Sequence, residues 1–445
     1  MKIEMDRRAL LLGGVITAGC ATLPSLDPSP PDLSAFVRRV GSRLMLGDRP
    51  YRYVGANMWY AAYLGADASY GDRARLGREL DTLAALGVRN LRIMASAEEG
   101  PLRNSIKPGF RNARGVFNEA LLGGLDYALA EMGKRGIRAV LCLTNFWEWS
   151  GGMMTYLSYV NGGRFVDMND PAHPWPAFAN ANASFYRSLR ANTLYRDWIK
   201  ALVTRTNKIT GVGYHDDPTI MAWQLANEPR PAGDLAHANL PVFYSWVQES
   251  ARLIKSLDTN HLVSTGSEGL KGALEQPEIV LAEHNPPEID YLTAHIWPNN
   301  WTWVNQNDLP GTYARGEELT ADYVSEHVDL ATRLQKPLVI EEFGYPRDGG
   351  SNDPTASTVY KDRFYRQIYS SALASMAAGG PIAGTNFWAW NGEARAQHPD
   401  YRFKEGDHQY MGDPPHEPQG WYGVFQGDST IRTIVDHARA VAKLS

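Results

Sequence analysis

The chain alternates between short apolar runs and longer segments in which apolar residues recur every three or four positions. Short apolar runs are typical of buried parallel strands, and the longer spacing is typical of helices packed on one face. Strands are predicted at residues 51–57, 88–94, 137–144, 219–226, 261–266, 290–296, 337–342 and 382–388. Helices are predicted at residues 72–86, 119–134, 185–208, 243–257, 321–334, 359–378 and 431–444, and a hairpin at residues 37–48 precedes the first strand.

About eight strand–helix units in one chain favour a (β/α)8 TIM barrel, which is an α/β fold. The alternative, a doubly wound open sheet, usually carries a glycine-rich phosphate turn after its first strand, and residues 57–60 (Asn-Met-Trp-Tyr) contain no glycine. We therefore expect one barrel domain over residues 36–445. Long segments at residues 147–184, 297–319 and 391–428 follow predicted strands, where barrel active sites are built, and we expect them to form a substrate cleft.

The beginning of the chain has the composition of a targeting segment followed by a tether. Arg7 and Arg8 precede an apolar stretch and small residues then lead to Cys20, so residues 1–20 resemble a signal peptide of the lipoprotein or twin-arginine type. An N-terminal membrane anchor is the alternative, although the apolar stretch is short for one. Residues 21–35 are rich in proline and predict a tether. We expect an exported protein that is periplasmic, secreted, or held at the outer membrane or cell surface by a lipid on Cys20.

The composition narrows the range of partners. A formal net charge of −5 over 445 residues provides no basic field for nucleic acid. The 13 Trp and 22 Tyr fit either an aromatic-rich core or a groove of flat rings that stack on the apolar faces of sugars. Cys142 lies inside a predicted strand, and no His or Cys cluster has the spacing of metal ligands, so we expect no disulfide framework, no metal and no organic cofactor. We also expect a monomer.

Two glutamates follow predicted strands that lie far apart in the sequence. Residues 227–230 (Asn-Glu-Pro-Arg) close one apolar run, and residues 341–344 (Glu-Glu-Phe-Gly) close another. Cleavage of a glycosidic bond needs one carboxylic acid at the leaving oxygen and one carboxylate at the sugar carbon, and Glu228 and Glu342 can fill these roles. Because neighbouring side chains on a strand point to opposite faces, we expect only one of Glu341 and Glu342 to face the barrel mouth.

Other side chains at strand ends suit the same chemistry. Asn227 can hold the sugar 2-hydroxyl, and Arg92 can keep one carboxylate ionised by its charge. His295 can orient the acid or relay a proton beside it. Trp388 can form the floor of a sugar subsite.

At this point the sequence resembles glycoside hydrolase family 5, in clan A of the retaining barrel hydrolases. That resemblance implies that Glu228 is the acid/base and Glu342 the nucleophile. A narrower resemblance, to bacterial endo-β-1,4-mannanases, rests on five motifs. They are Gly-Ala-Asn-Met-Trp-Tyr at 55–60, Leu-Thr-Asn-Phe-Trp-Glu at 143–148, Ala-Asn-Glu-Pro-Arg at 226–230, His-Ile-Trp-Pro-Asn-Asn-Trp at 295–301 and Thr-Asn-Phe-Trp-Ala-Trp at 385–390, with a further likeness at 412–422.

From the motifs and the strand ends we expect a set of substrate-binding residues beside the two glutamates. They are Trp59, Arg92, Asn145, Trp147, Asn227, Arg230, His295, Trp297, Trp301, Trp388 and Trp390, with Trp149 and Trp303 as further candidates. Trp297 stands where many members of the family have Tyr, and Asn145 stands where many have His. The resemblance places Arg230 on the leaving-group sugar, and the alternative is a surface arginine that caps the next turn.

These observations predict a retaining endo-β-1,4-mannanase that acts on mannan, glucomannan or galactomannan. A β-1,4-glucanase with the same two carboxylates is one alternative, because mannose and glucose differ only at the 2-hydroxyl. An exo-acting, mannobiose-releasing enzyme is a second alternative, if one loop closes the cleft. A noncatalytic carbohydrate-binding barrel is a third, which the presence of both glutamates and Asn227 disfavours.

Overall fold

The structure is a computed structural model and describes residues 33–444. The predicted signal peptide at residues 1–20, Cys20, and residues 21–32 of the predicted tether lie outside the described residues. Within the part of the chain that is described, no helix combines the length and the apolar character needed to cross a membrane.

Eight parallel strands form the central sheet in the order β8-β7-β6-β5-β4-β11-β10-β9. Ser264, at the end of β8, also bridges in parallel to Tyr291, directly before β9, so the two ends of this order meet and the sheet closes. The barrel strands are β4 (Tyr53–Asn57), β5 (Asn90–Met94), β6 (Arg138–Cys142), β7 (Ile220–Gln224), β8 (Leu262–Ser264), β9 (Leu292–Ile296), β10 (Leu338–Phe343) and β11 (Ile382–Phe387). The prediction of a (β/α)8 TIM barrel is confirmed.

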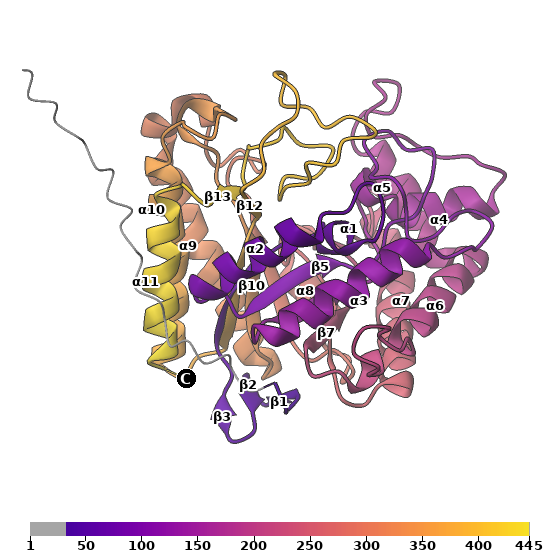
Figure 1. The fold of residues 1–445 in the computed structure, drawn as a ribbon, viewed down its shortest axis with the longest axis horizontal. Helices are drawn as coiled ribbons and strands as arrows, with labels where there is room; N and C mark the ends of the chain where they lie inside the picture. The colour runs from indigo at the N-terminus through magenta and orange to yellow at the C-terminus, as the bar shows by residue number, and fades with distance from the viewer. Residues whose placement is uncertain (1–32, 445) are drawn as a thin grey trace, which may run out of the picture.

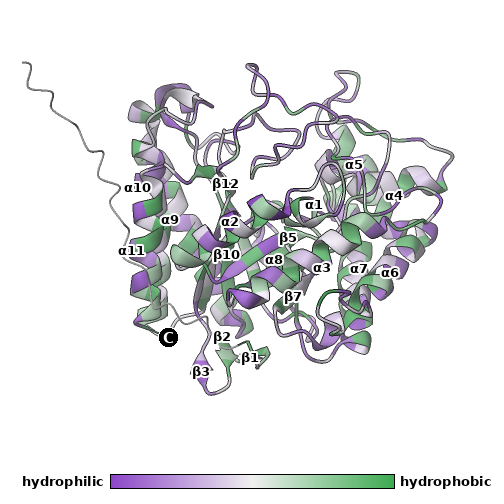
Figure 2. Ribbon diagram, in the orientation of Figure 1, coloured by the Kyte–Doolittle hydropathy of each residue, from purple (hydrophilic) through white to green (hydrophobic). Residues whose placement is uncertain are grey.

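Helices surround the barrel on its outer face (Figure 1). They are α1 (Ala61–Gly65), α2 (Arg73–Ala85), α3 (Glu119–Lys134), α4 (Gly152–Val160), α5 (Ala177–Asn182), α6 (Leu189–Val203), α7 (Ala236–Leu257), α8 (Pro277–His284), α9 (Leu309–Leu334), α10 (Val359–Ala377) and α11 (Thr430–Ala442). In Figure 2, α10 and α11 carry alternating hydrophobic and hydrophilic stripes, as expected for helices with one buried face. In α11 the buried residues Ile431, Ile434, Val435 and Ala438 follow this spacing.

Several helical regions lie where the sequence predicted loops or no element, and α1 is one of them. The predicted loop at 147–184 contains α4 and α5, and most of α4 is buried, so it lacks the polar face that makes a helix recognisable from its pattern. Helix α9 begins at Leu309, inside the predicted loop at 297–319, and α8 was not predicted. Both α8 and α9 carry proline in the first turn, a position that a helix tolerates because its N–H would be unpaired there.

The two ends of the barrel differ. Strands β1 (Val37–Val40), β2 (Arg43–Leu46) and β3 (Arg49–Pro50) form a small antiparallel sheet at the lower end in Figure 1. Val37 and Leu44 of this sheet join a hydrophobic cluster with Tyr53 at the start of β4, so the amino ends of the strands are covered. The coil of residues 391–428, drawn in yellow, crosses the opposite end, where the carboxyl ends of the strands carry the site.

Candidate active site

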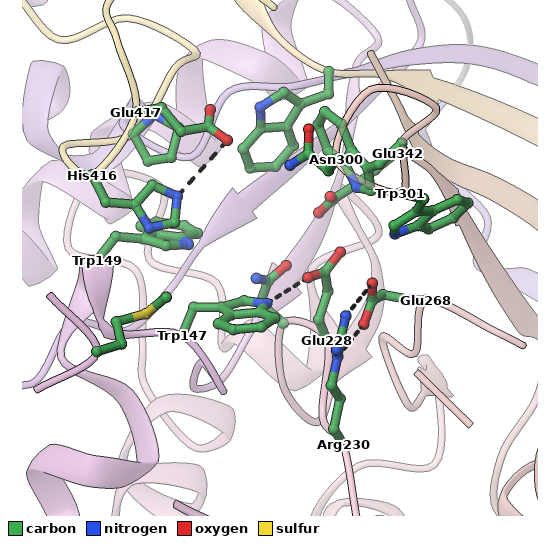
Figure 3. Close-up of a pocket in the computed structure, with 15 residues that line it drawn as sticks. Trp147, Trp149, Glu228, Arg230, Glu268, Asn300, Trp301, Glu342, His416 and Glu417 are labelled. Carbon is green, nitrogen blue, oxygen red and sulfur yellow. Dashed lines mark hydrogen bonds and ion pairs between the residues drawn. The ribbon is translucent and has the colours of Figure 1, made fainter. Parts of the chain in front are cut away.

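A pocket of about 350 Å³ lies at the carboxyl ends of the barrel strands (Figure 3). It is lined by Trp147, Trp149, Met168, Asn227, Glu228, Arg230, Glu268, Trp297, Asn300, Trp301, Glu342, Trp388, Pro414, His416 and Glu417. Both predicted glutamates therefore line the same cavity, although Glu228 follows β7 and Glu342 lies near the end of β10.

Glu228 stands four residues beyond the end of β7, in a turn of unusual backbone conformation. Its φ is 48°, a left-handed value that residues with a β-carbon adopt rarely and that clusters at functional sites. The Glu228 N–H donates to the carbonyl of Gly266 at 2.9 Å, which holds the turn against the segment after β8. Its Oε2 accepts a hydrogen bond from the indole N–H of Trp147, and its Oε1 lies 2.7 Å from Nδ1 of His295.

Glu342 lies inside β10 and faces Glu228 across the pocket. Its Oε1 accepts a hydrogen bond from Nη1 of Arg92, and its Oε2 lies 3.2 Å from Nδ1 of His295. One oxygen of Glu228, one oxygen of Glu342 and a ring nitrogen of His295 lie within 4.8 Å of one another. His295 thus stands between the two carboxylates and contacts both.

Only Glu342 of the paired acids lines the pocket, as expected, but Glu341 also turns toward the barrel interior beneath it. The register between β10 and β9 shifts between Ile340 and Glu342, and this irregularity breaks the alternation of side chains. Oε2 of Glu341 accepts from Nε2 of Gln224 at 2.6 Å and lies 3.4 Å from Nε of Arg92. Glu341 is buried beneath the pocket and does not line it.

Arg92, in β5, is buried below Glu342 and connects several strands. Its Nη2 donates to Oδ1 of Asn227 at 2.7 Å, and its Nε donates to Oε1 of Gln224 at 2.7 Å. Its pKa is raised, because the neighbouring Glu342 and Glu341 outweigh the effect of burial. Arg92 was predicted among the substrate-binding residues, but it contacts the carboxylate from below and does not line the pocket.

The charge on His295 follows from its surroundings. Burial favours the neutral ring, but Glu342, Glu228 and Glu341 together raise the pKa of His295 well above its usual value. The cluster of Glu228, His295 and Glu342 has the compactness of a metal site, yet the cationic Arg92 beside it and the raised pKa of His295 both oppose a metal ion. The arrangement suits proton transfer and charge stabilisation instead.

Asn145 supports Asn227 and does not reach the pocket itself. Nδ2 of Asn227 donates to Oδ1 of Asn145 at 3.0 Å, and the same Oδ1 accepts from the backbone N–H of Trp147 at 2.9 Å. Nδ2 of Asn145 donates to the Ser150 hydroxyl at 3.0 Å, which fixes the orientation of the amide. Asn145 is fully buried and, unlike Asn227, is absent from the pocket lining.

Five of the predicted tryptophans line the pocket, and three do not. Those in the pocket are Trp147, Trp149, Trp297, Trp301 and Trp388. Trp390 is fully buried behind the barrel wall, where its indole N–H donates to Glu79. Trp59 is buried beneath Trp149, and its indole N–H donates to the carbonyl of Gly412 at 3.0 Å. Trp390 and Trp59 are therefore too deeply buried to serve as surfaces for sugar. Trp303 is half-buried outside the pocket lining and packs edge-on against Trp301.

Arg230 was predicted either to contact the leaving-group sugar or to cap a surface turn, and its position matches neither prediction completely. It lines the pocket, but its Nε and Nη2 donate to the two carboxylate oxygens of Glu268 at 2.6 and 2.8 Å. Its guanidinium also lies 4.9 Å from the centre of the Trp147 ring. Arg230 is therefore held firmly beside Glu228, and it does not cap a surface turn.

Several pocket residues were not predicted. Glu268 follows β8 and could have been found as a further acid at a strand end, whereas Met168 and Asn300 carry no such signal. Glu417 and His416 lie in the 412–422 segment, for which the sequence predicted a likeness to mannanases and no individual site residue. Burial opposes charge on His416, but Glu148, 3.2 Å from its Nδ1, raises the pKa of His416 to about 10.

Comparisons with known proteins agree with this geometry. A family described as "GH family 5 beta-mannosidase-like" matches residues 34–445. A protein of Oryza sativa subsp. japonica, "Putative mannan endo-1,4-beta-mannosidase 9", is 33% identical over 365 residues, which is 79% of this chain and 81% of the relative. The crystal structure of a glycoside hydrolase family 5 mannosidase from Rhizomucor miehei is 33% identical with a TM-score of 0.84, covering 93% of this chain and 99% of that one.

A second structure of the Rhizomucor miehei mannosidase, with one glutamate replaced by alanine, contains mannosyl-fructose and has a TM-score of 0.85 at 33% identity, covering 93% of this chain and 99% of that one. An endo-1,4-beta-mannanase of the same fungus matches with a TM-score of 0.67 at 22% identity, covering 92% of this chain and 100% of that one, which shows the fold alone. The relatives at 33% identity come from a plant and a fungus, so they do not support membership of a bacterial subgroup.

Proposed function

The chain belongs to glycoside hydrolase family 5, and on that premise we propose that it hydrolyses β-1,4-mannosidic bonds with retention of configuration. Glu228 donates a proton to the leaving oxygen while Glu342 attacks the anomeric carbon, and Glu228 then removes a proton from the incoming water. The observation that carries this proposal is the spacing of the two carboxylates. One oxygen of Glu228 and one oxygen of Glu342 lie within 4.8 Å of each other. This close approach favours a retaining enzyme, whose carboxyl groups are roughly 5–5.5 Å apart, over an inverting one, which needs roughly 6.5–9.5 Å to admit a water.

The surrounding residues favour this division of roles. Glu342 receives a hydrogen bond from the cationic Arg92, which orients its carboxylate in the pocket, as a nucleophile requires. Glu228 is more exposed than Glu342 and contacts the Trp147 indole in the pocket lining, so it can meet a leaving group that passes Trp147. Asn227 and Trp388 line the same pocket and can bind the 2-hydroxyl and the apolar face of the sugar that is cleaved.

The mannan substrate is supported by the names of the relatives. Those names describe mannan endo-1,4-beta-mannosidases and family 5 mannosidases, at up to 33% identity over most of the chain. The experiment that tests the substrate compares initial rates on linear mannan, glucomannan, galactomannan and cellulose. We expect rapid release of reducing ends from the mannans and little from cellulose. Equal rates on cellulose would overturn the proposal in favour of a β-1,4-glucanase.

One specific observation favours exo-acting hydrolysis over the endo mode that the sequence suggested. The coil of residues 391–428 supplies Pro414, His416 and Glu417 to the pocket lining, where an open cleft was expected. His416 contacts Glu148, so this coil meets the segment after β6 beside the pocket, where the two can limit the length of the cleft. A volume of about 350 Å³ is also at the small end of the range for ligand pockets.

Product analysis separates the two modes of action. An exo enzyme releases one short product from linear mannan from the first minutes, while the viscosity of the solution falls slowly. An endo enzyme gives a ladder of products and a rapid fall in viscosity. If His416 and Glu417 close the pocket, His416→Ala should increase the share of longer products, and a wild-type ladder from the start would contradict this second candidate.

Export is part of the proposal. Arg7, Arg8, the apolar stretch after them and Cys20 support a lipoprotein or twin-arginine signal, and a polysaccharide substrate is met outside the cell. Labelling of the expressed protein with a fatty acid, and its loss in Cys20→Ala, tests for the lipid anchor.

A further inference from the structure

Trp175 is an exposed tryptophan beside the pocket. Within residues 33–444 it is the tryptophan with the largest exposed fraction, 57%, whereas the others are buried or half-buried. An indole combines a large apolar face with a polar N–H, which suits contact with an amphipathic ligand such as a sugar. Trp175 does not line the pocket itself. If it binds substrate, it therefore contacts a part of the sugar chain that lies outside the pocket.

The ring of Trp175 continues a row of stacked rings that begins inside the pocket. Trp147 stacks on Trp175, with ring centres 6.2 Å apart and planes inclined by 28°. The guanidinium of Arg230 lies 5.9 Å from the centre of the Trp175 ring and 4.9 Å from that of Trp147. A sugar chain that leaves the pocket past Trp147 and Arg230 would therefore reach Trp175 next.

The backbone at Trp175 is held firmly against the turn that carries the catalytic glutamate. Gly233, three residues after Arg230, approaches Pro176 so closely that a β-carbon at Gly233 would clash with the proline ring. Oδ1 of Asn180 accepts hydrogen bonds from the backbone N–H groups of Gly233, at 3.1 Å, and Leu235, at 3.3 Å. The exposed ring thus stands on a fixed support, which lowers the entropic cost of binding a ligand there.

The side of the pocket follows from the chemistry of Glu228. The acid that protonates the glycosidic oxygen lies on the leaving-group side of the bond, and the Trp147 indole donates directly to Glu228. We propose that Trp175 is a binding surface for a leaving-group sugar beyond the first, in a β-1,4-linked mannan chain. This proposal rests on the proposed function and adds a subsite to it.

The test compares substrates that differ in the number of sugars on the leaving-group side. An aryl β-mannoside carries no such sugar, and β-1,4-manno-oligosaccharides of two to six units carry a growing number. For Trp175→Ala we expect kcat/KM to be unchanged on the aryl mannoside and to fall by about five- to tenfold on the longer oligosaccharides, the effect of one lost aromatic contact. Trp175→Phe should restore most of the loss.

The matched control is Phe165→Ala, which removes another exposed aromatic ring, 38% exposed, from the same excursion between α4 and α5. It should leave all substrates unaffected. An equal change on every substrate, no change on any, or the same length dependence in Phe165→Ala would overturn the inference. A wild-type enzyme that cleaves no β-mannoside would instead refute the proposed function on which the inference rests, so the two failures are distinguishable.

Discussion

The carboxylates of Glu341 and Glu342 both reach the guanidinium of Arg92, although the two residues are neighbours on one strand. A shift of register in β10 makes this possible and places a third carboxylate below the two that face the pocket. Nε2 of His295 lies 3.6 Å from Glu341, while its Nδ1 contacts Glu228 and Glu342. Glu341 therefore acts on the electrostatics of the site without touching the space that substrate occupies.

Replacing Glu341 by Gln removes one of the three negative charges that raise the pKa of His295 while keeping the shape of the side chain. We expect the pKa of His295 to fall, so the alkaline limb of the kcat–pH profile should move to lower pH. KM should change little, because Glu341 does not line the pocket. Steady-state kinetics from pH 4 to pH 9 measure this shift, and an unchanged profile together with raised KM would contradict it.

Trp390 should be important for stability and unimportant for catalysis. In Trp390→Phe the buried Glu79 loses the indole donor, and a space is left beside it, so we expect a loss of about 1–3 kcal/mol in the free energy of unfolding. The kcat/KM of the folded variant should stay within about twofold of the wild type. Trp388→Phe is the matched comparison, because Trp388 lines the pocket and should lower kcat/KM with a smaller effect on stability. A large loss of kcat/KM in Trp390→Phe with unchanged stability would show that Trp390 belongs to the substrate site.

Glu98 should make the protein less stable as the pH rises. Burial raises the pKa of Glu98 from 4.5 to about 7, so its contribution to stability is complete below pH 4.5 and is lost as the pH rises through 7. In Glu98→Gln this contribution does not titrate, while the side chain can still accept the N–H of Gly152. We expect the wild type to lose roughly 1–3 kcal/mol more than the variant between pH 5 and pH 8.

Denaturant unfolding at the two pH values measures this difference. Glu99→Gln serves as the control, since Glu99 is exposed on the same segment and should leave the pH dependence of the wild type intact. Parallel curves for the wild type and Glu98→Gln would show that Glu98 does not titrate as expected.

Much of the fold, and the pair of Glu228 and Glu342, could be predicted because the sequence patterns that indicate them are local. A buried parallel strand is an apolar run wherever it pairs, and the positions of Glu228 and Glu342 depend only on where such runs end. The orientation of Glu341 could not be predicted, because it depends on how β10 pairs with β9. Strands β9 and β10 are about fifty residues apart in the sequence, and no residue near Glu341 indicates how they pair.

The different positions of Trp388 and Trp390 could not be predicted from the sequence either, although these residues are close together in it. Trp388 and Trp390 are two residues apart and would share a face if the strand continued. Strand β11 ends at Phe387 and β12 (Trp390–Gly392) begins a separate pairing with β13 (Val424–Phe425), so the two rings diverge to the pocket and to the core. Trp175 is far from every strand end, and only the folded chain brings it to Trp147.

The central claim is that Glu228 and Glu342 act by double displacement on a β-mannosidic bond. Proton NMR of the first minutes of hydrolysis of a β-manno-oligosaccharide measures the anomer that is released before mutarotation. The account predicts the β-anomer, since a glycosyl–enzyme intermediate at Glu342 inverts the carbon twice. Initial release of the α-anomer would show a single displacement by water and would contradict it.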